Sequence, residues 1–441
     1  MRHKLKHVPH KTMIDEQSIR AVGESRFGEH FRKPLYEGYA FAQLPQLIRS
    51  LLTGEDSHVV PHGIPFGPRE DLRGKYDTVV LFFIDAFGWC FIDRYLDHPF
   101  LKRMEQDGLI TKISSQFPST TAAHVTTIHT GLPVGQSGIY EWYYYEPVLD
   151  AVISPLLFSF AGDKERDTLL KAGADPLRLF PTDTIYFDLA NHGVKSFVLQ
   201  DHQYTHSPYT EVVTSGATLV PYRSLPEAIV TLAELIERQK ERTYYFLYYD
   251  KIDSVCHEHG PNARQLDAEI RAVLWMLETF LIPAMKSPRR KSLFMMTADH
   301  AHTHIDPATT FYLNESMREL IPLLRRNRRG DLIVPAGSSR DMFLHIKEGH
   351  LNEAREMLNH QLHGRAEIYK TDDLIEQGFF GSTPPSAAFL GRIGDLVILP
   401  YAGESVWWYE QGRFEQKFYG SHGGLTPEEM ETALLVQAFG G

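Results

Sequence analysis

Three short apolar runs, each leading to an aspartate, constrain the fold of this 441-residue chain most strongly. Residues 78–84 (TVVLFFI) run into Asp85, residues 244–249 (YYFLYY) precede Asp253, and residues 293–298 (LFMMTA) run into Asp299. Such nearly continuous apolar runs, rich in β-branched and aromatic residues, are typical of strands buried on both faces of a parallel sheet. Ligands of open α/β sheets lie outside the carboxyl ends of the strands. The three aspartates therefore predict one shared site.

The segments around these runs continue an alternation of strands and helices. Further strands are expected at 109–115 and 194–199, and helices at 44–52, 100–106, 225–239, 263–285 and 351–362. A strand, a helix and a second strand in this order form a right-handed crossover unit of a parallel sheet. The predicted fold class is α/β, with a mostly parallel central sheet, helices on both faces, and a smaller inserted α+β cap.

The alternation weakens between residues 305 and 420, where short strand-like pieces surround one helical stretch. We expect this region to be an inserted cap subdomain over the site, with strands that return to the core. Residues 76–304 and 421–441 are then the core, and residues 1–75 an N-terminal arm that packs on it. Within the last segment, Thr426 followed by Glu429 has the pattern of a helix capping box.

Charge and composition exclude several kinds of partner. The formal net charge of −11 argues against a nucleic-acid duplex or an anionic membrane surface as the main partner. Cys90 and Cys256 form no C-x-x-C pair, so a reducing compartment is expected. The basic start MRHKLKHVPHKTM lacks the apolar core of a signal peptide, and no run of about 18 apolar residues could span a bilayer. We therefore expect a cytoplasmic protein without membrane contact.

The stretch 117–131, FPSTTAAHVTTIHTG, places a run of hydroxyl groups after the predicted strand 109–115. We interpret this stretch as a nucleophile loop, with Thr120 and Thr121 as the candidates. A threonine hydroxyl is a weak nucleophile at neutral pH and needs an activator, which a bound metal ion can supply by favouring the alkoxide.

Carboxylate and imidazole side chains recur at the predicted strand ends. In chain order they are Asp85, Asp253, His257, Asp299, His300 and His422. A mixture of oxygen and nitrogen ligands suits zinc or manganese better than calcium or magnesium. Two divalent ions about 3.5–4 Å apart are a known device for in-line displacement at phosphorus, because they clamp the attacking and leaving oxygens. The residues therefore predict two adjacent metal clusters.

Five segments of the chain together resemble the type I phosphodiesterase/nucleotide pyrophosphatase family of the alkaline phosphatase superfamily. They are LFFIDAFG, FPSTTAAHVTTIHTGLPVGQSGI, YYDKIDSVCHEHGP, MMTADH and GSHGGLTPEEM, and they follow the family's order between Asp85 and His422. Each segment alone is a weak signal, whereas five in order are a strong one. The resemblance implies an alkaline phosphatase-like fold and a two-metal-dependent hydrolase.

The same resemblance implies a role for each site residue. The residues implied for one metal ion are Asp85, Asp299 and His300, and those implied for the other are Asp253, His257 and His422. In the family's FPSxT pattern the nucleophile stands three residues after the proline, which makes Thr121 the implied nucleophile and a metal ligand. Thr120 is the near alternative. The implied cofactors are two divalent metal ions, with Zn²⁺ expected and Mn²⁺ as the alternative.

Two positions depart from the family's pattern. Phosphodiesterase members usually carry an asparagine three residues after the nucleophile, where it donates to a phosphate oxygen. This chain has His124 there, and we expect His124 to occupy the substrate-binding position. The family's DHG turn is DHA here, with Ala301, and it is followed by His302 and His304, to which the resemblance assigns no role.

Other polar and aromatic residues compete for a place in the site. Asp250, three residues before Asp253, is a rival metal ligand that the D-x-x-x-H spacing disfavours. The Asp-His pair at 201–202 follows a predicted strand and imitates the pair at 299–300. The aromatic stretch 142–145 could stack a nucleotide base, although core packing is the more common role of such residues.

The predicted function is a two-metal-dependent phosphodiesterase or nucleotide pyrophosphatase-like hydrolase that acts through a phosphothreonine intermediate. Its expected partner is a small phosphate ester or a nucleotide-like substrate. Two alternatives remain open at this point. One is a phosphomonoesterase of the same superfamily, and the other is a non-catalytic metal-binding member that acts by protein interaction.

Overall fold

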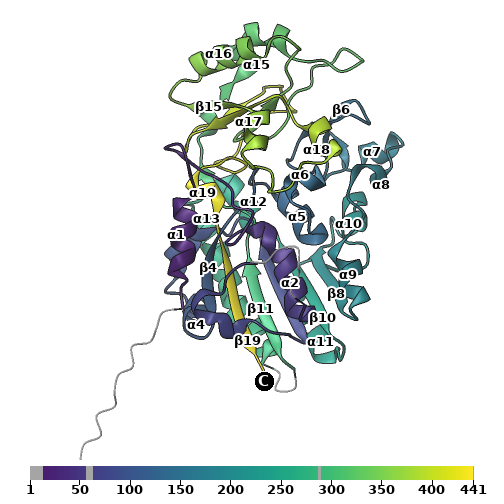
Figure 1. Ribbon diagram of the computed structural model, residues 1–441, viewed down its shortest axis with the longest axis vertical. Coiled ribbons are helices and arrows are strands. Elements are labelled where there is room, and N and C mark those ends of the chain that lie inside the picture. Colours follow the sequence, from purple (N-terminus) through teal and green to yellow (C-terminus); the bar gives the residue numbers. More distant parts are fainter. Residues whose placement is uncertain (1–12, 56–62, 287–289, 441) are drawn as a thin grey trace, which may run out of the picture.

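The computed structural model describes residues 13–55, 63–286 and 290–440 of the chain (Figure 1). The basic start of the chain and residues 56–62 of the predicted N-terminal arm lie outside these ranges. Within the described ranges, no helix is both long enough and apolar enough to cross a membrane. Cys90 and Cys256 are both free thiols.

A seven-stranded sheet forms the centre of the molecule, with the strand order β4-β19-β11-β3-β10-β8-β9. The strands are β3 (Thr78–Ile84), β4 (Leu109–Ser114), β8 (Lys195–Asp201), β9 (Thr218–Tyr222), β10 (Thr243–Tyr249), β11 (Ser292–Thr297) and β19 (Glu431–Phe439). Six strands share one direction, and β19 runs antiparallel to both of its neighbours. The predicted α/β class with a mostly parallel sheet is therefore confirmed.

Helices cover both faces of this sheet because successive strand residues face two different apolar cores. In β3, Val79 belongs to one core and Val80 to the other. The first core includes α2 (Leu44–Thr53), α5 (Thr121–Thr130) and α9 (Ile185–Asn191), and the second includes α4 (Pro99–Asp107), α11 (Leu225–Arg238) and α13 (Arg264–Met276). All seven residues of β3 are buried, which explains why the run shows no polar alternation.

The helices and strands expected from the sequence agree with the structure to within two residues, with one exception in the long helix predicted at 263–285. There α13 continues into a π-helical segment (Leu277–Leu281) and the short helix α14 (Ile282–Met285). A π-helical turn inserts one extra residue without ending the helix. The amphipathic pattern therefore extends through all three pieces.

The C-terminal segment differs from the expectation of a helix. The capping box between Thr426 and Glu429 forms, but its helix α19 (Pro427–Met430) has only four residues. The chain then enters β19, which lies between β4 and β11 in the sheet. The run ETALLVQAF is apolar enough to fit a buried strand or a buried helix, and periodicity alone does not separate the two.

A second, smaller sheet lies at the opposite end of the molecule from the C-terminus (Figure 1). It contains β14 (Met342–Leu344), β16 (Leu396–Pro400) and β15 (Ala366–Lys370), with α16 (Leu351–Gln361) packed against it in a third apolar core. Because β19 leads away from this end, the parallel strands of the central sheet point toward it. Their carboxyl ends therefore face the smaller sheet.

Burial of histidine in the first core makes stability depend on pH. His129 of α5 is buried, its Nδ1 lies 2.6 Å from the Tyr186 hydroxyl, and burial lowers its pKa to about 3. In the unfolded chain the pKa of this histidine is about 6.5. Between about pH 3 and pH 6.5 the unfolded chain therefore binds up to one proton more than the folded protein. The neutral His129 ring therefore makes its full contribution to the free energy of unfolding above about pH 6.5. This contribution declines as the pH falls and is lower by about 2 kcal/mol at pH 5.

We expect His129→Gln to reduce the decrease in unfolding free energy between pH 7 and pH 5 by about 2 kcal/mol, since glutamine does not titrate. Urea unfolding followed by circular dichroism at both pH values measures this difference. His363→Gln, at an exposed position, should leave the decrease unchanged. An identical pH dependence in wild type and His129→Gln would contradict the prediction.

Candidate active site

Helix α5 begins at Thr121, directly after Thr120, whose backbone is extended (φ −127°, ψ 149°). The sequence predicted one nucleophile loop over 117–131, and the structure corrects this, because the hydroxyl-rich run 121–130 is helical. The helix ends at Gly131, whose φ of 75° favours glycine. Amide groups of a first helical turn lack carbonyl partners within the helix, so this end of α5 suits an anion such as phosphate.

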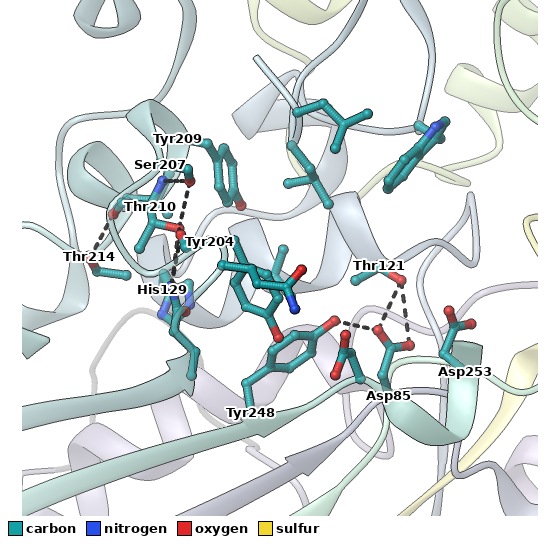
Figure 2. A pocket seen from close by; sticks show the side chains of 18 of the residues that line it. Asp85, Thr121, His129, Tyr204, Ser207, Tyr209, Thr210, Thr214, Tyr248 and Asp253 are labelled. Atoms are coloured by element: carbon teal, nitrogen blue, oxygen red, sulfur yellow. Dashed lines mark hydrogen bonds between the residues drawn. The ribbon is translucent and has the colours of Figure 1, made fainter. Parts of the chain in front are cut away.

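The two candidate threonines point in different directions. Thr121 Oγ1 lies 3.3 Å from Asp85 Oδ2 and 3.3 Å from His300 Nε2, beside a cavity (Figure 2). The hydroxyl of Thr120 is buried and donates to the carbonyl oxygen of Tyr140 at 2.9 Å. The geometry therefore favours Thr121 as the nucleophile.

Asp85, Asp299 and His300 meet where the neighbouring strands β3 and β11 end. His300 Nε2 lies 3.4 Å from Asp299 Oδ2 and 3.6 Å from Asp85 Oδ1, and all three residues are buried. Asp299 Oδ1 accepts from the backbone N–H groups of Ala86 and His300, whereas Oδ2 has no hydrogen-bond partner among the described residues. Burial and the charge of Asp299 raise the pKa of Asp85 well above its ordinary range. A cation bound between Asp85, Asp299 and His300 would offset both the burial of the two carboxylates and the repulsion of Asp85 by Asp299.

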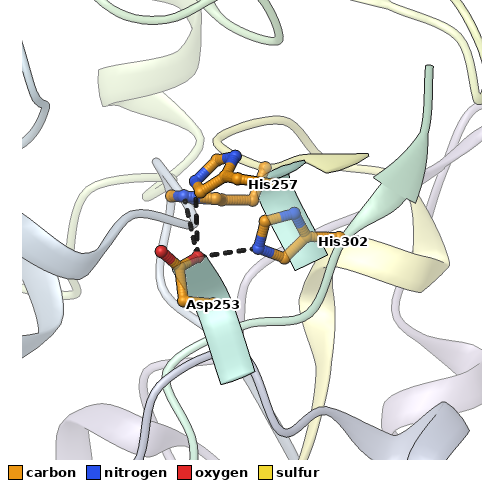
Figure 3. A group of neighbouring side chains, drawn as sticks. Asp253, His257 and His302 are labelled. Carbon is orange, nitrogen blue, oxygen red and sulfur yellow. Dashed lines mark hydrogen bonds and ion pairs between the residues drawn. The ribbon is translucent and has the colours of Figure 1, made fainter. Parts of the chain in front are cut away.

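A second group surrounds one carboxylate oxygen of Asp253, in the first turn of α12 (Lys251–His259) (Figure 3). The Nε2 atoms of His302, His257 and His422 lie 2.7, 3.4 and 3.7 Å from Asp253 Oδ1. Burial alone would raise the pKa of Asp253, but the neighbouring histidines and the hydrogen bond from His302 hold it below its ordinary range. The structure thus brings the six predicted ligands into the two predicted groups of three.

Backbone carbonyl groups orient two imidazoles of the second group. His257 Nδ1 lies 2.8 Å from the Gly420 oxygen, and His422 Nδ1 lies 2.9 Å from the Ser119 oxygen. Since a carbonyl oxygen only accepts hydrogen bonds, Nδ1 carries the proton in both rings. Nε2, which faces Asp253, therefore has a lone pair that could bind a metal ion. This arrangement is usual for metal-ligating histidines. Together with the unpartnered Asp299 Oδ2, it shows that the two groups fit divalent metal ions.

His302 is a member of the second group that sequence reasoning missed. Its ring is buried, and Nε2 lies closer to Asp253 than any other histidine nitrogen of the group. The chain is extended here, with β12 (Thr303–His304) paired to β18 (Gly420–Ser421). The His302 ring lies against those of His257 and His422, with 4.5 and 5.0 Å between the ring centroids, whereas His304 is exposed. The sequence signal that could have identified His302 is its position two residues after His300, which itself follows the strand-end Asp299.

His124 does not face the cavity, which differs from the substrate contact expected for it. The ring is buried, and Nδ1 donates to the Thr120 carbonyl oxygen at 2.7 Å. Nε2 accepts from the Gln116 N–H at 3.0 Å and lies 2.9 Å from the Ser115 hydroxyl. Burial lowers the pKa of His124 to about 3, so the ring is neutral. With both nitrogens engaged, His124 links the loop after β4 to the start of α5.

A cavity of about 330 Å³ opens beside Thr121 (Figure 2). Of the aromatic stretch 142–145, Trp142 lines this cavity. Tyr143 stacks on Trp407 of the third apolar core, and Tyr144 stacks on Tyr140 in the first core. The interpretation of this stretch as a base-stacking surface is therefore restricted to Trp142.

The two rival acidic positions lie outside both groups. Asp250 lines the cavity, and its Oδ2 lies 3.1 Å from Lys251 Nζ. Asp201 Oδ1 accepts from the Gln203 N–H at 2.9 Å and lies 3.1 Å from His202 Nδ1. The geometry therefore agrees with the D-x-x-x-H spacing, which favoured Asp253.

A buried ion pair supports the loop that carries His422. Arg340 donates to both carboxylate oxygens of Glu429, at 2.9 and 3.0 Å, and both side chains are fully buried. Glu429 also accepts from the Gly424 N–H, and the Ser338 hydroxyl donates to the His422 carbonyl oxygen at 3.1 Å. Ser338 and Arg340, which lie shortly before β14, thus fix the backbone around His422.

Comparisons with known proteins agree with this geometry. The family described as type I phosphodiesterase / nucleotide pyrophosphatase matches residues 79–425. Murine ectonucleotide pyrophosphatase/phosphodiesterase 5 has a similar structure, with a TM-score of 0.60 and 17% identity over 82% of this chain and 88% of that chain. An inactive variant of the murine protein in complex with AMP gives 0.61 and 16%, over 82% and 87%.

Phosphonoacetate hydrolase from Sinorhizobium meliloti 1021, in complex with phosphonoacetate, is a further structural relative. Its TM-score is 0.58 and its identity 16%, over 81% of this chain and 89% of that chain. The TM-scores show that the fold is shared. Identities this low do not show which substrates this chain takes. A search of curated proteins finds no match.

The contact between His302 and Asp253 predicts a role in metal affinity. Residues that hold a ligating carboxylate usually contribute about 10–100-fold to affinity. We expect His302→Ala to weaken Zn²⁺ binding at the second group by about this factor, measured by competition with a chromophoric chelator. His304→Ala, which removes an exposed ring two residues away, serves as the matched control and should bind like wild type. Equal affinity of wild type and His302→Ala would contradict the prediction.

Proposed function

Because this chain belongs to the type I phosphodiesterase / nucleotide pyrophosphatase family and is a phosphoric ester hydrolase, we propose that it cleaves phosphodiester or pyrophosphate bonds through a phosphothreonine at Thr121. The observation that carries this proposal is the position of Thr121 Oγ1. It lies at the start of α5, 3.3 Å from Asp85 Oδ2 and from His300 Nε2, beside a cavity.

Two divalent metal ions belong to the proposed site. The residues that would hold them are Asp85, Asp299 and His300 for one ion, and Asp253, His257 and His422 for the other. Histidine nitrogen and carboxylate oxygen together favour Zn²⁺, with Mn²⁺ as the alternative. When bound, such ions lower the pKa of hydroxyl groups and water and neutralise charge on phosphate oxygens.

The chain's own residues position and activate the nucleophile. Thr121 gives up its hydroxyl proton toward Asp85 Oδ2, 3.3 Å away, and its oxygen attacks phosphorus. As the Oγ–P bond forms, the bond from phosphorus to the leaving ester oxygen breaks, and the electron pair stays on that oxygen. The free amide groups in the first turn of α5 can donate to the phosphate oxygens. Water then attacks phosphorus, Thr121 Oγ leaves, and the oxygen regains a proton.

The cavity beside Thr121 supports a diester substrate over a monoester. Arg166 is the one arginine or lysine among the described lining residues, and its Nη2 already donates to the Leu156 carbonyl oxygen at 3.0 Å. Asp250 adds a carboxylate to the lining. A monoester dianion, which carries more charge than a diester, gains less from such surroundings. The small ligands named for the structural relatives, AMP and phosphonoacetate, support a small substrate here.

The test compares hydrolysis of bis-p-nitrophenyl phosphate with that of p-nitrophenyl phosphate. Metal-stripped protein is reloaded with Zn²⁺ or Mn²⁺, and release of p-nitrophenolate is followed by absorbance. We expect diester cleavage that requires added metal and that falls at least about 10³-fold in Thr121→Ala, because the variant lacks the hydroxyl that lies beside Asp85 and His300. The matched control Thr120→Val removes the neighbouring hydroxyl, which points away, and should retain most activity.

Different results would assign different functions. A preference for the monoester would identify a phosphomonoesterase on the same fold. If Thr120→Val lost activity and Thr121→Ala retained it, the nucleophile would be Thr120. Bound metal without turnover of either ester would contradict the proposed hydrolysis and favour a non-catalytic metal-binding protein.

A further inference from the structure

Phe418 is an exposed aromatic residue that lies against the second group of metal-binding residues. Its ring contacts the imidazole of His257, with 4.6 Å between the ring centroids and 41° between the ring planes. The residue nevertheless remains 46% exposed. Aromatic side chains offer a large apolar area for contacts with other rings. Because Phe418 contacts a site residue on one side and solvent on the other, it can also contact a ligand of that site.

Hydrogen bonds hold the backbone on both sides of this ring. The Phe418 N–H donates to Gln416 Oε1 at 3.1 Å, and the Tyr419 N–H donates to the His257 carbonyl oxygen at 2.8 Å. Gln416 Nε2 in turn donates to the Ser339 hydroxyl at 2.7 Å. The backbone at Phe418 is thus fixed before a ligand binds, which lowers the entropic cost of a contact with the ring.

The two groups of metal-binding residues differ in their access to solvent. In the first group, the side chains of Asp299 and His300 are 0% exposed and that of Asp85 is 3% exposed. In the second group, the side chains of Asp253 and His257 are 16% and 19% exposed. Part of a substrate can therefore lie over the second group, whereas protein encloses the first.

The geometry of in-line displacement indicates which part of the substrate this is. The attacking oxygen, Thr121 Oγ1, lies beside Asp85 and His300 of the first group. A two-metal site stabilises both the attacking and the leaving oxygen. The leaving oxygen therefore belongs at the second group, and the substituent on it extends toward His257 and Phe418. Neither of these two residues is among the described residues that line the cavity beside Thr121, so the cavity is left for the retained ester group.

We propose that Phe418 forms the leaving-group site of this hydrolase and selects leaving groups that carry an aromatic ring. The ring of the leaving group packs on the exposed side of Phe418, and His257 supports the other side. An aromatic pair of this kind contributes about two- to twelvefold to a binding or rate constant. The inference rests on the proposed function, because an ester has a leaving group only if it is cleaved at Thr121.

The experiment uses three methyl phosphodiesters that differ in the leaving group, which is 2-naphthyl, phenyl or 2,2,2-trifluoroethyl. All three release methyl phosphate, which is measured by phosphorus NMR. With metal-loaded wild type we expect kcat/KM for the naphthyl ester to exceed that for the phenyl ester at least about threefold, because the two alcohols have similar acidity and the naphthyl ring offers the larger contact area.

Three variants test the assignment to Phe418. Phe418→Ala should lower the naphthyl-to-trifluoroethyl ratio of kcat/KM at least about fivefold. The ratio cancels any effect on metal binding that both esters share. Phe418→Tyr keeps the aromatic ring and should keep the ratio. Tyr419→Ala is the matched control, because Tyr419 is also exposed but its β-carbon lies beside Gly260 at the end of α12, and we expect it to behave like wild type.

Binding without turnover provides a second measurement. In the Thr121→Ala background, which lacks the nucleophile, the dissociation constant of the naphthyl ester can be measured from the fluorescence of its ring. We expect the additional change Phe418→Ala to weaken this binding several-fold and the additional change Tyr419→Ala to leave it unchanged.

The outcomes separate this inference from the function on which it rests. Hydrolysis of bis-p-nitrophenyl phosphate by wild type, with the naphthyl and phenyl esters cleaved equally well, would overturn the inference alone. A naphthyl-to-trifluoroethyl ratio that Phe418→Ala leaves unchanged, or that Tyr419→Ala lowers as much, would overturn it as well. Absence of any diester hydrolysis by metal-loaded wild type would overturn the proposed function and this inference together.

Discussion

The burial of two neighbouring carboxylates, Asp85 and Asp299, is the constraint on which the rest of this structure depends. They come together because β3 and β11 are neighbours that end at the same edge of the sheet. Ala86, in a strained left-handed conformation (φ 63°), donates its N–H to Asp299, and the Tyr248 hydroxyl donates to Asp85. These hydrogen bonds do not offset the burial of the charges. A divalent cation bound there would do so, which agrees with the fit of these residues to a metal ion.

The far end of the chain completes this site. His422 stacks on His300, with 3.6 Å between the ring centroids, although the two residues are more than a hundred positions apart. The pairing of β12 with β18 and the buried pair of Arg340 and Glu429 hold this approach. Breaking a buried ion pair usually leaves an uncompensated charge, which is strongly destabilising. Ser338 and Arg340, which precede β14 of the smaller sheet, therefore contribute to the geometry of the site by holding the segment around His422.

Much of this architecture could be predicted from the sequence, because buried parallel strands leave an unmistakable apolar run before each site aspartate. The pairing of Asp253 with His257 also followed from helical spacing. Other features depend on tertiary contacts that no local pattern encodes. The run 431–439 is an antiparallel strand because it pairs with β4 on one side and with β11 on the other. The direction of His124 likewise follows from the hydrogen bonds that both of its ring nitrogens make.

The measurement that tests the central claim most directly is a search for phosphate on the nucleophile. Metal-loaded protein is mixed with bis-p-nitrophenyl phosphate, quenched in acid within the first turnover, digested, and analysed by tandem mass spectrometry. The account predicts a phosphoryl ester adduct on the peptide that contains residues 117–131, located on Thr121, with p-nitrophenolate released in equal amount. Turnover without an adduct on Thr121 under these conditions, or an adduct on another residue, would contradict the account.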